Sequence, residues 1–230
     1  MRKRHLKAVF LDTVPVLTGY LFLGMGFGIL LTESGYGVLW ALAMSIFVFA
    51  GSGQYLAVSL LANSSGLLSA AIATLLVNAR HLFYGISLLE KYKGTGKKKP
   101  YLIFALTDET YSLVTQNEPP EGMSRHSYCF TVSMLDHIYW ITGCTLGALV
   151  GQFIPINYEG IEFVLTALFV TMFVDRWLTN KDHFPAMVGV CATFVSLLLF
   201  GSEFFLIPAM VLIAQLLTLS PKTGRRDSNA

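Results

Sequence analysis

Long apolar stretches alternate with short polar or glycine-rich separators along the whole chain. The charge-free runs are twenty residues between Asp12 and Glu33, forty-six between Glu33 and Arg80, twenty-one between His137 and Glu159, and twenty between Asp182 and Glu203. An α-helix needs about 20 apolar residues to cross the hydrocarbon core of a bilayer. The pattern therefore predicts several membrane-spanning helices.

Separators divide these runs into about eight apolar segments, each of which is predicted to be helical. The segments cover residues 9–31, 38–62, 66–89, 101–116, 128–150, 160–176, 184–200 and 204–219. The remainder is a basic N-terminal tail (1–8), a basic loop (90–100) and a polar C-terminal tail (220–230). We therefore predict an all-α polytopic membrane protein, with one transmembrane domain over residues 1–230 surrounded by membrane lipid.

Composition agrees with a membrane protein and argues against other classes. Hydrophobic residues make up 54% of the chain and charged residues 13%, half of the ~25% that soluble domains carry. The formal net charge of +2 is too small to indicate a nucleic-acid partner. Cys129, Cys144 and Cys191 are scattered through apolar stretches without metal or redox spacing, so we expect buried small side chains and no metal site or cofactor.

Basic residues lie in three clusters, which the positive-inside rule assigns to the cytoplasm. The clusters are Arg2, Lys3, Arg4 and Lys7; Lys91, Lys93, Lys97, Lys98 and Lys99; and Lys222, Arg225 and Arg226. Successive clusters require an even number of crossings between them, yet three apolar segments separate the first two and five separate the second from the third. One segment in each half must then enter and leave by the same face. This predicts six full crossings with two re-entrant or paired half-helices.

The segment 38–62 carries the break that such a half-helix pair needs, at residues 49–54 (Phe-Ala-Gly-Ser-Gly-Gln). Two glycines that flank a serine interrupt a helix readily. Non-helical backbone at membrane depth persists only where protein or a water-filled cavity satisfies it, so a break here indicates a binding site. The alternative is a continuous helix whose glycines allow close packing.

A faint internal similarity links the segments 9–31 and 128–150. Each has a Thr-Gly pair followed by two more glycines, at positions 18, 19, 24 and 28 and at positions 142, 143, 147 and 151. In the six-crossing topology we expect these two helices to run in opposite directions, which predicts inverted repeats. Glycine spacing for ordinary helix packing is the alternative.

Arg80 is a charged residue at the depth of the lipid core. It precedes the lysine loop by about ten residues, or ~15 Å of helix, which puts it near the midplane at the depth of Gly51. On a straight helix Asn78 and His81 share one face, whereas Arg80 lies nearly opposite Asn78. All three therefore reach one ligand only if the helix unwinds locally.

Acidic residues in the segment 101–116 form the second polar feature at depth. Asp108 begins a polar stripe with Tyr111, Ser112 and Thr115, and Glu109 is turned about 100° away from it. A structural ion pair of Arg80 with Asp108 or Glu109 competes with a transport role, and both can hold together. The charged residues at segment ends are expected to be solvated at the interface: Asp136, His137, Asp175, Arg176 and Glu203.

These features resemble the AzlC family, the azaleucine-resistance permeases that form the large subunit of branched-chain amino acid exporters. The resemblance covers roughly residues 8–218 and is carried by Pro15, the 49–54 break, the stretches 78–84 (Asn-Ala-Arg-His-Leu-Phe-Tyr) and 107–111 (Thr-Asp-Glu-Thr-Tyr), and Trp140 with Gly143, Gly147 and Gly151. It implies a secondary transporter of a bacterial plasma membrane that exports valine, leucine, isoleucine and analogues. It also implies a separate small multi-span subunit, an AzlD-like partner, since this chain shows no fused partner.

An amino-acid zwitterion needs a cationic group, an anionic or carbonyl group, and an apolar pocket, so the candidate residues can be given roles. The predicted substrate-binding residues are Phe49, Gly51, Ser52, Gly53, Gln54, Asn78 and Arg80, with Phe47 and Phe83 beside Phe49 in the side-chain pocket. A half-helix that starts after Ser52 would aim its N–H groups at the carboxylate. The predicted proton-coupling residues are His81, Asp108 and Glu109. One methylene is worth only ~1–3 kcal/mol in such a pocket, so we expect a broad substrate range.

Other functional classes compete with a proton-coupled exporter. A passive amino-acid channel or a non-transporting assembly subunit would not need acidic residues at depth for coupling. An intramembrane enzyme could use His81, Asp108 and Glu109 as acids and bases, but no nucleophile elbow or HExxH motif accompanies them. We therefore expect no enzymatic activity.

Overall fold

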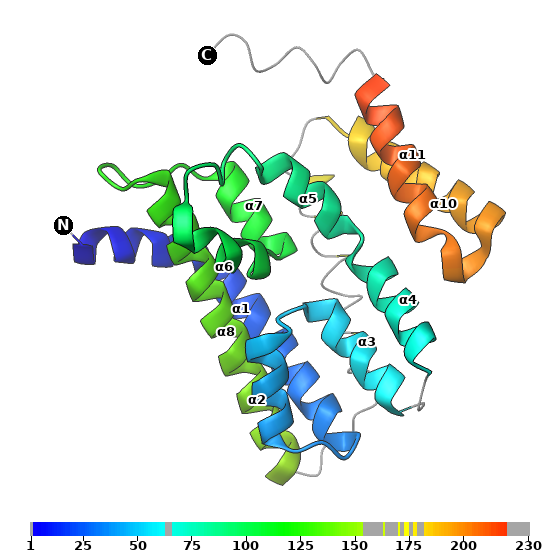
Figure 1. Cartoon of the computed structure of the whole chain (residues 1–230), viewed down its shortest axis with the longest axis horizontal. Coiled ribbons are helices and arrows are strands. Elements are labelled where there is room, and N and C mark those ends of the chain that lie inside the picture. Colours follow the sequence, from blue (N-terminus) through cyan, green and yellow to red (C-terminus); the bar gives the residue numbers. More distant parts are fainter. Residues whose placement is uncertain are drawn as a thin grey trace.

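The computed structural model describes residues 2–62, 66–153 and 182–219, together with 163, 170, 173–174 and 177–178. All regular structure in these residues is helical, which confirms the all-α prediction (Figure 1). The predicted segment 160–176, with Asp175 and Arg176, and the C-terminal tail 220–230 lie outside the described residues. The count of eight segments and of six crossings therefore stays a prediction.

Two long helices, α1 (Arg2–Glu33) and α8 (Arg125–Phe153), pack against each other along their length. Their glycines are required at this contact, because a Cβ on Gly24 would lie 2.8 Å from the backbone nitrogen of Cys144. A Cβ on Gly143 would lie 2.6 Å from the backbone oxygen of Tyr20. The contacts advance in the same order along both helices, so α1 and α8 run in the same direction. The prediction that they run in opposite directions is wrong.

The parallel direction of α1 and α8 arises from the segment 101–116, which is not one helix. It divides into α6 (Lys99–Phe104) and α7 (Asp108–Gln116), with a break at residues 105–107. In Figure 1, α6 runs from the upper end toward the middle of the molecule and α7 returns. The chain is therefore back at the upper end when α8 begins, and α8 repeats the direction of α1.

The predicted break in the segment 38–62 is confirmed. Here α2 (Val38–Phe47) ends and α3 (Gly51–Ala62) begins, so the non-helical residues are 48–50 and the half-helix starts at Gly51 rather than after Ser52. Figure 1 shows α2 rising from the lower end and α3 turning back toward it. The pairs α2–α3 and α6–α7 thus approach the middle from opposite ends.

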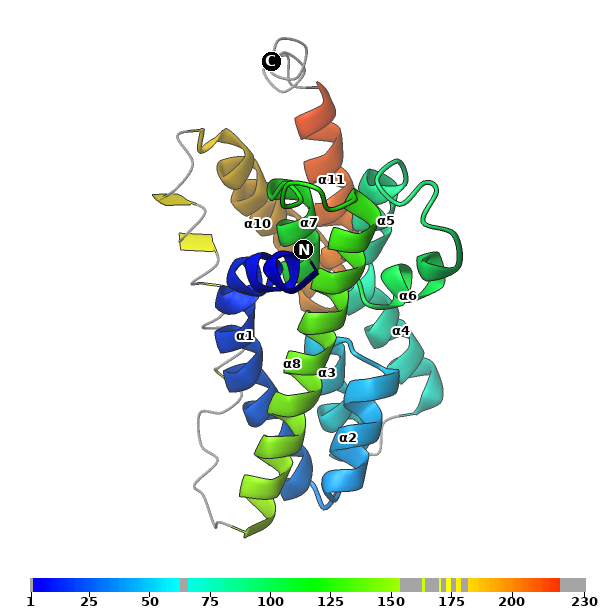
Figure 2. The ribbon, with the colours of Figure 1, turned by 90° about the vertical axis from the view of Figure 1, so that its left-hand side faces the viewer.

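The segment 66–89 is also interrupted, between α4 (Leu67–Asn78) and α5 (Arg80–Leu88) at Ala79. These helices return the chain to the upper end, where the lysine loop with its short 3-10 turn η1 (Gly96–Lys98) follows. Figures 1 and 2 both place this loop and the start of α1 toward the same end, as the shared location of the first two basic clusters predicts.

The last described helices, α10 (Phe184–Phe204) and α11 (Leu206–Leu219), form an antiparallel pair that reverses at Gly201, whose φ is 73°. Large apolar side chains of α10 stay exposed, among them Leu198 (71%) and Leu199 (72%). Two described helices, Arg4–Glu33 and Phe184–Ser202, are long and apolar enough to cross a membrane. Water does not favour an apolar surface of this extent, whereas lipid does.

Two of the three cysteines are buried as expected. Cys129 and Cys144 lie inside the helix packing, whereas Cys191 is exposed on α10, so the prediction of burial is wrong at that position. The difference arises because α10 packs mainly on α11 and leaves its other faces uncovered by the described residues.

Candidate functional site

The tips of the two interrupted helix pairs meet beside the packed pair α1–α8. The Phe49 ring at the α2–α3 break lies 6.3 Å from the ring of Phe104, which ends α6. Tyr20 of α1 makes an edge contact with Phe49 at 6.4 Å, and His137 of α8 stacks on it at 4.4 Å. We call this region the central junction: the breaks 48–50 and 105–107 together with the α1 and α8 side chains that contact them.

Tyr20 links α1 to the second break. Its hydroxyl lies 2.6 Å from Thr107 Oγ1 and donates to Glu109 Oε2 at 2.8 Å. Its ring makes an edge contact with Trp140 of α8 at 5.3 Å. Of the two adjacent carboxylates, Glu109 is thus the one that faces α1.

Asp136 precedes His137 on α8 and is a fully buried carboxylate next to the junction. Thr110 donates its hydroxyl hydrogen to Asp136 Oδ2 at 2.6 Å, whereas Oδ1 has no hydrogen-bond partner among the described residues. The ion pairs among these residues join Lys93 to Glu90 and Arg125 to Glu118, so no described cation neutralises Asp136. A buried carboxylate with a free oxygen is costly unless a proton, a cation or an N–H donor reaches it.

Gln54 presents the complementary group. Its Oε1 accepts from Trp140 Nε1 at 2.8 Å and from the Ala50 N–H at 3.2 Å, which caps the start of α3. Its Nε2 is buried and has no partner in the described part of the chain. Trp140 follows Asp136 by one helical turn, a rise of about 6 Å. The unsatisfied donor therefore comes from α3, on a side chain that contacts Trp140, while the unsatisfied acceptor, Asp136, lies on α8 four residues before Trp140.

His137 joins the junction to both helix pairs. Its Nε2 lies 3.1 Å from the backbone oxygen of Ser45 on α2, and its Nδ1 lies 3.1 Å from the Tyr101 hydroxyl on α6. The expectation that Asp136 and His137 are solvated interfacial residues is wrong. Both are buried near the middle of α8, because that helix begins at Arg125 and is longer than the apolar segment suggests.

The remaining predicted residues of the first break lie around the start of α3. Gly51 has a φ of 24°, and a Cβ built on it would meet no atom within 4 Å. A Cβ on Gly53 would lie 3.4 Å from Asn78 Nδ2, so the first turn of α3 lies next to the α4–α5 break. Ser52 belongs to the same turn. Phe47 is 77% exposed, so its predicted place in a pocket beside Phe49 is wrong.

His81 belongs to a separate group between α5 and α7. Its Nδ1 lies 3.1 Å from the Asn78 carbonyl oxygen, and its ring makes an edge contact with Tyr84 at 5.7 Å. Tyr84 in turn stacks on Tyr111 at 4.6 Å. The side chains of Arg80, Phe83 and Glu203 lie outside the described part of the structure, so their predicted roles stay predictions.

Two helix N-termini, which carry partial positive charge, point into the central junction. The first turn of α3 contains no acidic residue. At the start of α7 the Thr107 hydroxyl accepts from the Thr110 N–H at 3.2 Å, and Asp108 and Glu109 occupy the first turn. The α3 end therefore attracts an anion, while the α7 end and Asp136 supply negative charge for a cation. The described residues contain no group of three or more His, Cys, Asp or Glu side chains that could hold a metal ion.

Comparison with known proteins places these features in one family. The model of the AzlC protein family matches residues 15–154. The chain is 41% identical to the "Branched-chain amino acid transport protein AzlC" of Bacillus subtilis (strain 168), over 94% of this chain and 85% of the relative. It is 42% identical to an "Uncharacterized membrane protein" of Helicobacter pylori (strain ATCC 700392 / 26695), over 94% and 95%. It is 26% identical to the "Inner membrane protein YgaZ" of Escherichia coli (strain K12), over 87% and 82%. No solved structure matches the chain.

Proposed function

Because this chain belongs to the AzlC family, we propose that it transports branched-chain amino acids across the membrane through the central junction. The name of the Bacillus subtilis relative supports the substrate class. The observation that carries the proposal is the buried pair of unsatisfied groups, Gln54 Nε2 and Asp136 Oδ1. Satisfying both with one molecule requires a ligand that carries an acceptor and a donor, as an amino-acid zwitterion does.

In this proposal the two ends of the zwitterion bind to different breaks. The carboxylate lies at the uncompensated start of α3, near Ser52 and Gln54, where Gly51 and Gly53 allow close approach to the backbone. Asn78 lies beside Gly53 at the α4–α5 break, and Arg80 is the proposed cationic partner of the carboxylate. A planar guanidinium grips a carboxylate in a bidentate way, so Arg80→Lys should weaken substrate binding.

The ammonium group lies at the acidic side of the junction, with Asp136 as its direct partner. The substrate side chain packs against Phe49, whose ring is buried among Tyr20, Phe104 and His137. A pocket of this kind distinguishes one methylene by only ~1–3 kcal/mol, so valine, leucine and isoleucine should all be transported.

We further propose that the transport direction is export and that proton movement drives it. Asp108 and Glu109 on α7 and His81 on α5 are the proposed proton carriers. A net-neutral zwitterion gains nothing from the membrane potential, whereas one proton that moves inward supplies ~2.3 kcal/mol per 100 mV. This energy supports a roughly fifty-fold concentration ratio.

The proposed assembly is a two-component permease in the bacterial plasma membrane, with this chain as the large subunit and a small AzlD-like multi-span partner. The name of the Escherichia coli relative supports an inner-membrane location for that protein. The exposed apolar faces of α10 offer surface for a second membrane protein as well as for lipid.

Flux in proteoliposomes tests the proposal directly. Purified protein, with and without the small subunit, would be reconstituted and loaded with labelled valine, and efflux followed with and without an imposed pH gradient. We expect efflux of valine, leucine and isoleucine that a proton gradient accelerates and carries beyond equal concentrations. Equilibration without accumulation would indicate a passive channel, and absence of flux even with the small subunit would contradict the transport proposal.

A further inference from the structure

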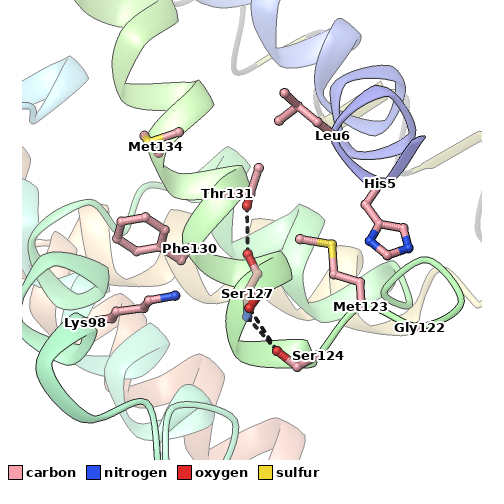
Figure 3. A pocket seen from close by; sticks show the side chains of 10 residues that line it. All are labelled: His5, Leu6, Lys98, Gly122, Met123, Ser124, Ser127, Phe130, Thr131 and Met134. Carbon is pink, nitrogen blue, oxygen red and sulfur yellow. Dashed lines mark hydrogen bonds between the residues drawn. The ribbon is translucent and has the colours of Figure 1, made fainter. Parts of the chain in front are cut away.

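A cavity of about 710 Å³ opens at the upper end of the molecule, outside the central junction. Figure 3 shows α8 running through its wall, with Lys98 and Phe130 on one side and His5 and Leu6 of α1 on the other. Ser124 and Ser127, at the start of α8, lie between these two sides. The cavity thus lies between two basic segments of the chain, the N-terminal tail and the lysine loop.

The polar part of the wall suits an anionic oxygen ligand, since none of the described residues that line the cavity carries a carboxylate. Lys98 Nζ lies 4.7 Å from the centroid of the Phe130 ring, a contact that holds the ammonium at the wall. Ser124 donates to Ser127 Oγ at 2.9 Å, which leaves the hydroxyl hydrogen of Ser127 for another acceptor. His5 is anchored by a bond from Nε2 to the backbone oxygen of Glu121 at 3.1 Å.

An apolar stripe continues from the cavity along the outward face of α8. Met134 lines the cavity, and Ile138 and Leu149 follow four and fifteen residues later, within about 60° of it around the helix axis. All three side chains are exposed, at 37%, 47% and 39%. A free anion would use the cations and hydroxyls alone, whereas a ligand with a hydrocarbon chain would cover the stripe as well.

We propose that this cavity binds the phosphate headgroup of an anionic phospholipid, with an acyl chain along the α8 stripe. Free phosphate carries the same oxygens as the lipid headgroup, but only the lipid also has a hydrocarbon chain that covers the apolar stripe. Location supports the same ligand. The positive-inside rule assigns this basic end to the cytoplasm, and the cytoplasmic leaflet carries the anionic lipids.

Lipid binding to the purified protein tests this proposal without any transport measurement. The protein in detergent would be titrated with phosphatidylglycerol, phosphatidylcholine or inorganic phosphate, and bound molecules counted by native mass spectrometry. We expect phosphatidylglycerol to bind at least about five-fold more tightly than phosphatidylcholine, the contribution of one lysine near an anionic headgroup. Lys98→Gln should remove that preference, and Met134→Ser should weaken both lipids while keeping it.

Lys93→Gln is the matched control, because it removes the same charge from the same loop at a residue that pairs with Glu90 (3.9 Å) and does not line the cavity. It should bind phosphatidylglycerol as the wild type does. Equal binding of the two lipids to the wild type, or equal losses in the two lysine variants, would overturn the proposal. Inorganic phosphate that binds alone with the same Lys98 dependence would replace the lipid with a simple anion. Displacement of phosphatidylglycerol by the small subunit would assign the cavity to a protein interface.

Discussion

The two breaks that meet at the central junction occupy corresponding places in their helix pairs but are built differently. At the α2–α3 break Phe49 and Gly51 have φ values of 42° and 24°, and no acidic residue follows in the first turn of α3. At the α6–α7 break Thr107 is extended, with a φ of −116°, and caps a first turn that carries Asp108 and Glu109. One break is strained and electropositive, and the other is relaxed and acidic.

In the proposed function, this difference distinguishes the two ends of the zwitterion. A left-handed conformation costs a non-glycine residue about 1–2 kcal/mol, so the buried ring contacts of Phe49 must stabilise it. A capped helix start with acidic residues carries no such cost. We therefore expect changes at the α2–α3 break to affect substrate passage, and changes at the α6–α7 break to affect coupling and stability.

The largest expected effect concerns the opposite entry of the two pairs. A cysteine at Gly37, at the start of α2, should react with an impermeant thiol reagent added outside sealed cells, whereas a cysteine at Lys97, before α6, should not. Permeabilised cells provide the control, because both cysteines should then react. Strong external labelling at position 97 would contradict the predicted entry of α6–α7 from the cytoplasmic side and of α2–α3 from the outer side.

Bulk at the strained break should abolish transport. Gly51→Leu puts a side chain into the junction at a residue with positive φ, so valine flux should fall to background while membrane insertion persists. Gly19→Leu is the matched control, since its Cβ also meets no atom within 4 Å but its backbone is helical. Retained flux in Gly51→Leu would mean that these glycines only loosen the chain.

Removing the buried charge at the acidic side should reduce transport next most. Asp136→Asn keeps an acceptor for Thr110 but loses the charge-assisted bond to the ammonium, worth about 2–3 kcal/mol or roughly 30- to 150-fold in flux at low substrate. Asp12→Asn removes a carboxylate that accepts from Tyr128 (3.2 Å) away from the junction, and it should transport normally. Comparable losses in both variants would point to general destabilisation.

Loss of the proton carrier should remove accumulation but not exchange. Glu109→Gln, with Asp108→Asn measured beside it, should lower the valine gradient from roughly fifty-fold to equilibrium while downhill exchange continues. Tyr20→Phe removes the hydroxyl that donates to Glu109 but keeps the carboxylate, and it should stay coupled. If both amide variants concentrate valine as the wild type does, the two carboxylates serve only the structure of α7.

The smallest effect is expected at the helix cap of the relaxed break. Thr107→Ala leaves the Thr110 N–H without its acceptor, so stability should fall by about 1 kcal/mol, or about 2–4 °C in Tm. Thr115→Ala removes the same hydroxyl from the last turn of α7, where it bonds the Tyr111 carbonyl, and should leave Tm nearly unchanged. An equal fall in Tm in the two variants would show that the cap at Thr107 contributes no more to stability than the hydroxyl of Thr115. Thermal unfolding in detergent measures the difference.

The helices and the first break were predictable from the chain alone because their causes are local. Apolar length indicates α1, α8 and α10, and the glycines at 51 and 53 supply the backbone freedom that ends α2. The break at 105–107 was missed because Ala105, Leu106 and Thr107 include no glycine or proline. The direction of α8, and with it the predicted inversion, depended on that missed break.

Asp136 was the more instructive omission. A signal was present, since an Asp-His pair inside an apolar segment is functional by default, but the predicted segment boundaries assigned the pair to a segment end. Asp136 is bonded by Thr110 from α7. Trp140, one turn further along α8, contacts Tyr20 from α1 and Gln54 from α3. These contacts join residues far apart in the chain, and a carboxylate has no local pattern that reveals which helices will exclude water from it. The positions of the helices and of the first break therefore followed from the order of residues. The burial of two unsatisfied groups, Gln54 Nε2 and Asp136 Oδ1, in one region arose only from the packing of α1, α3, α7 and α8.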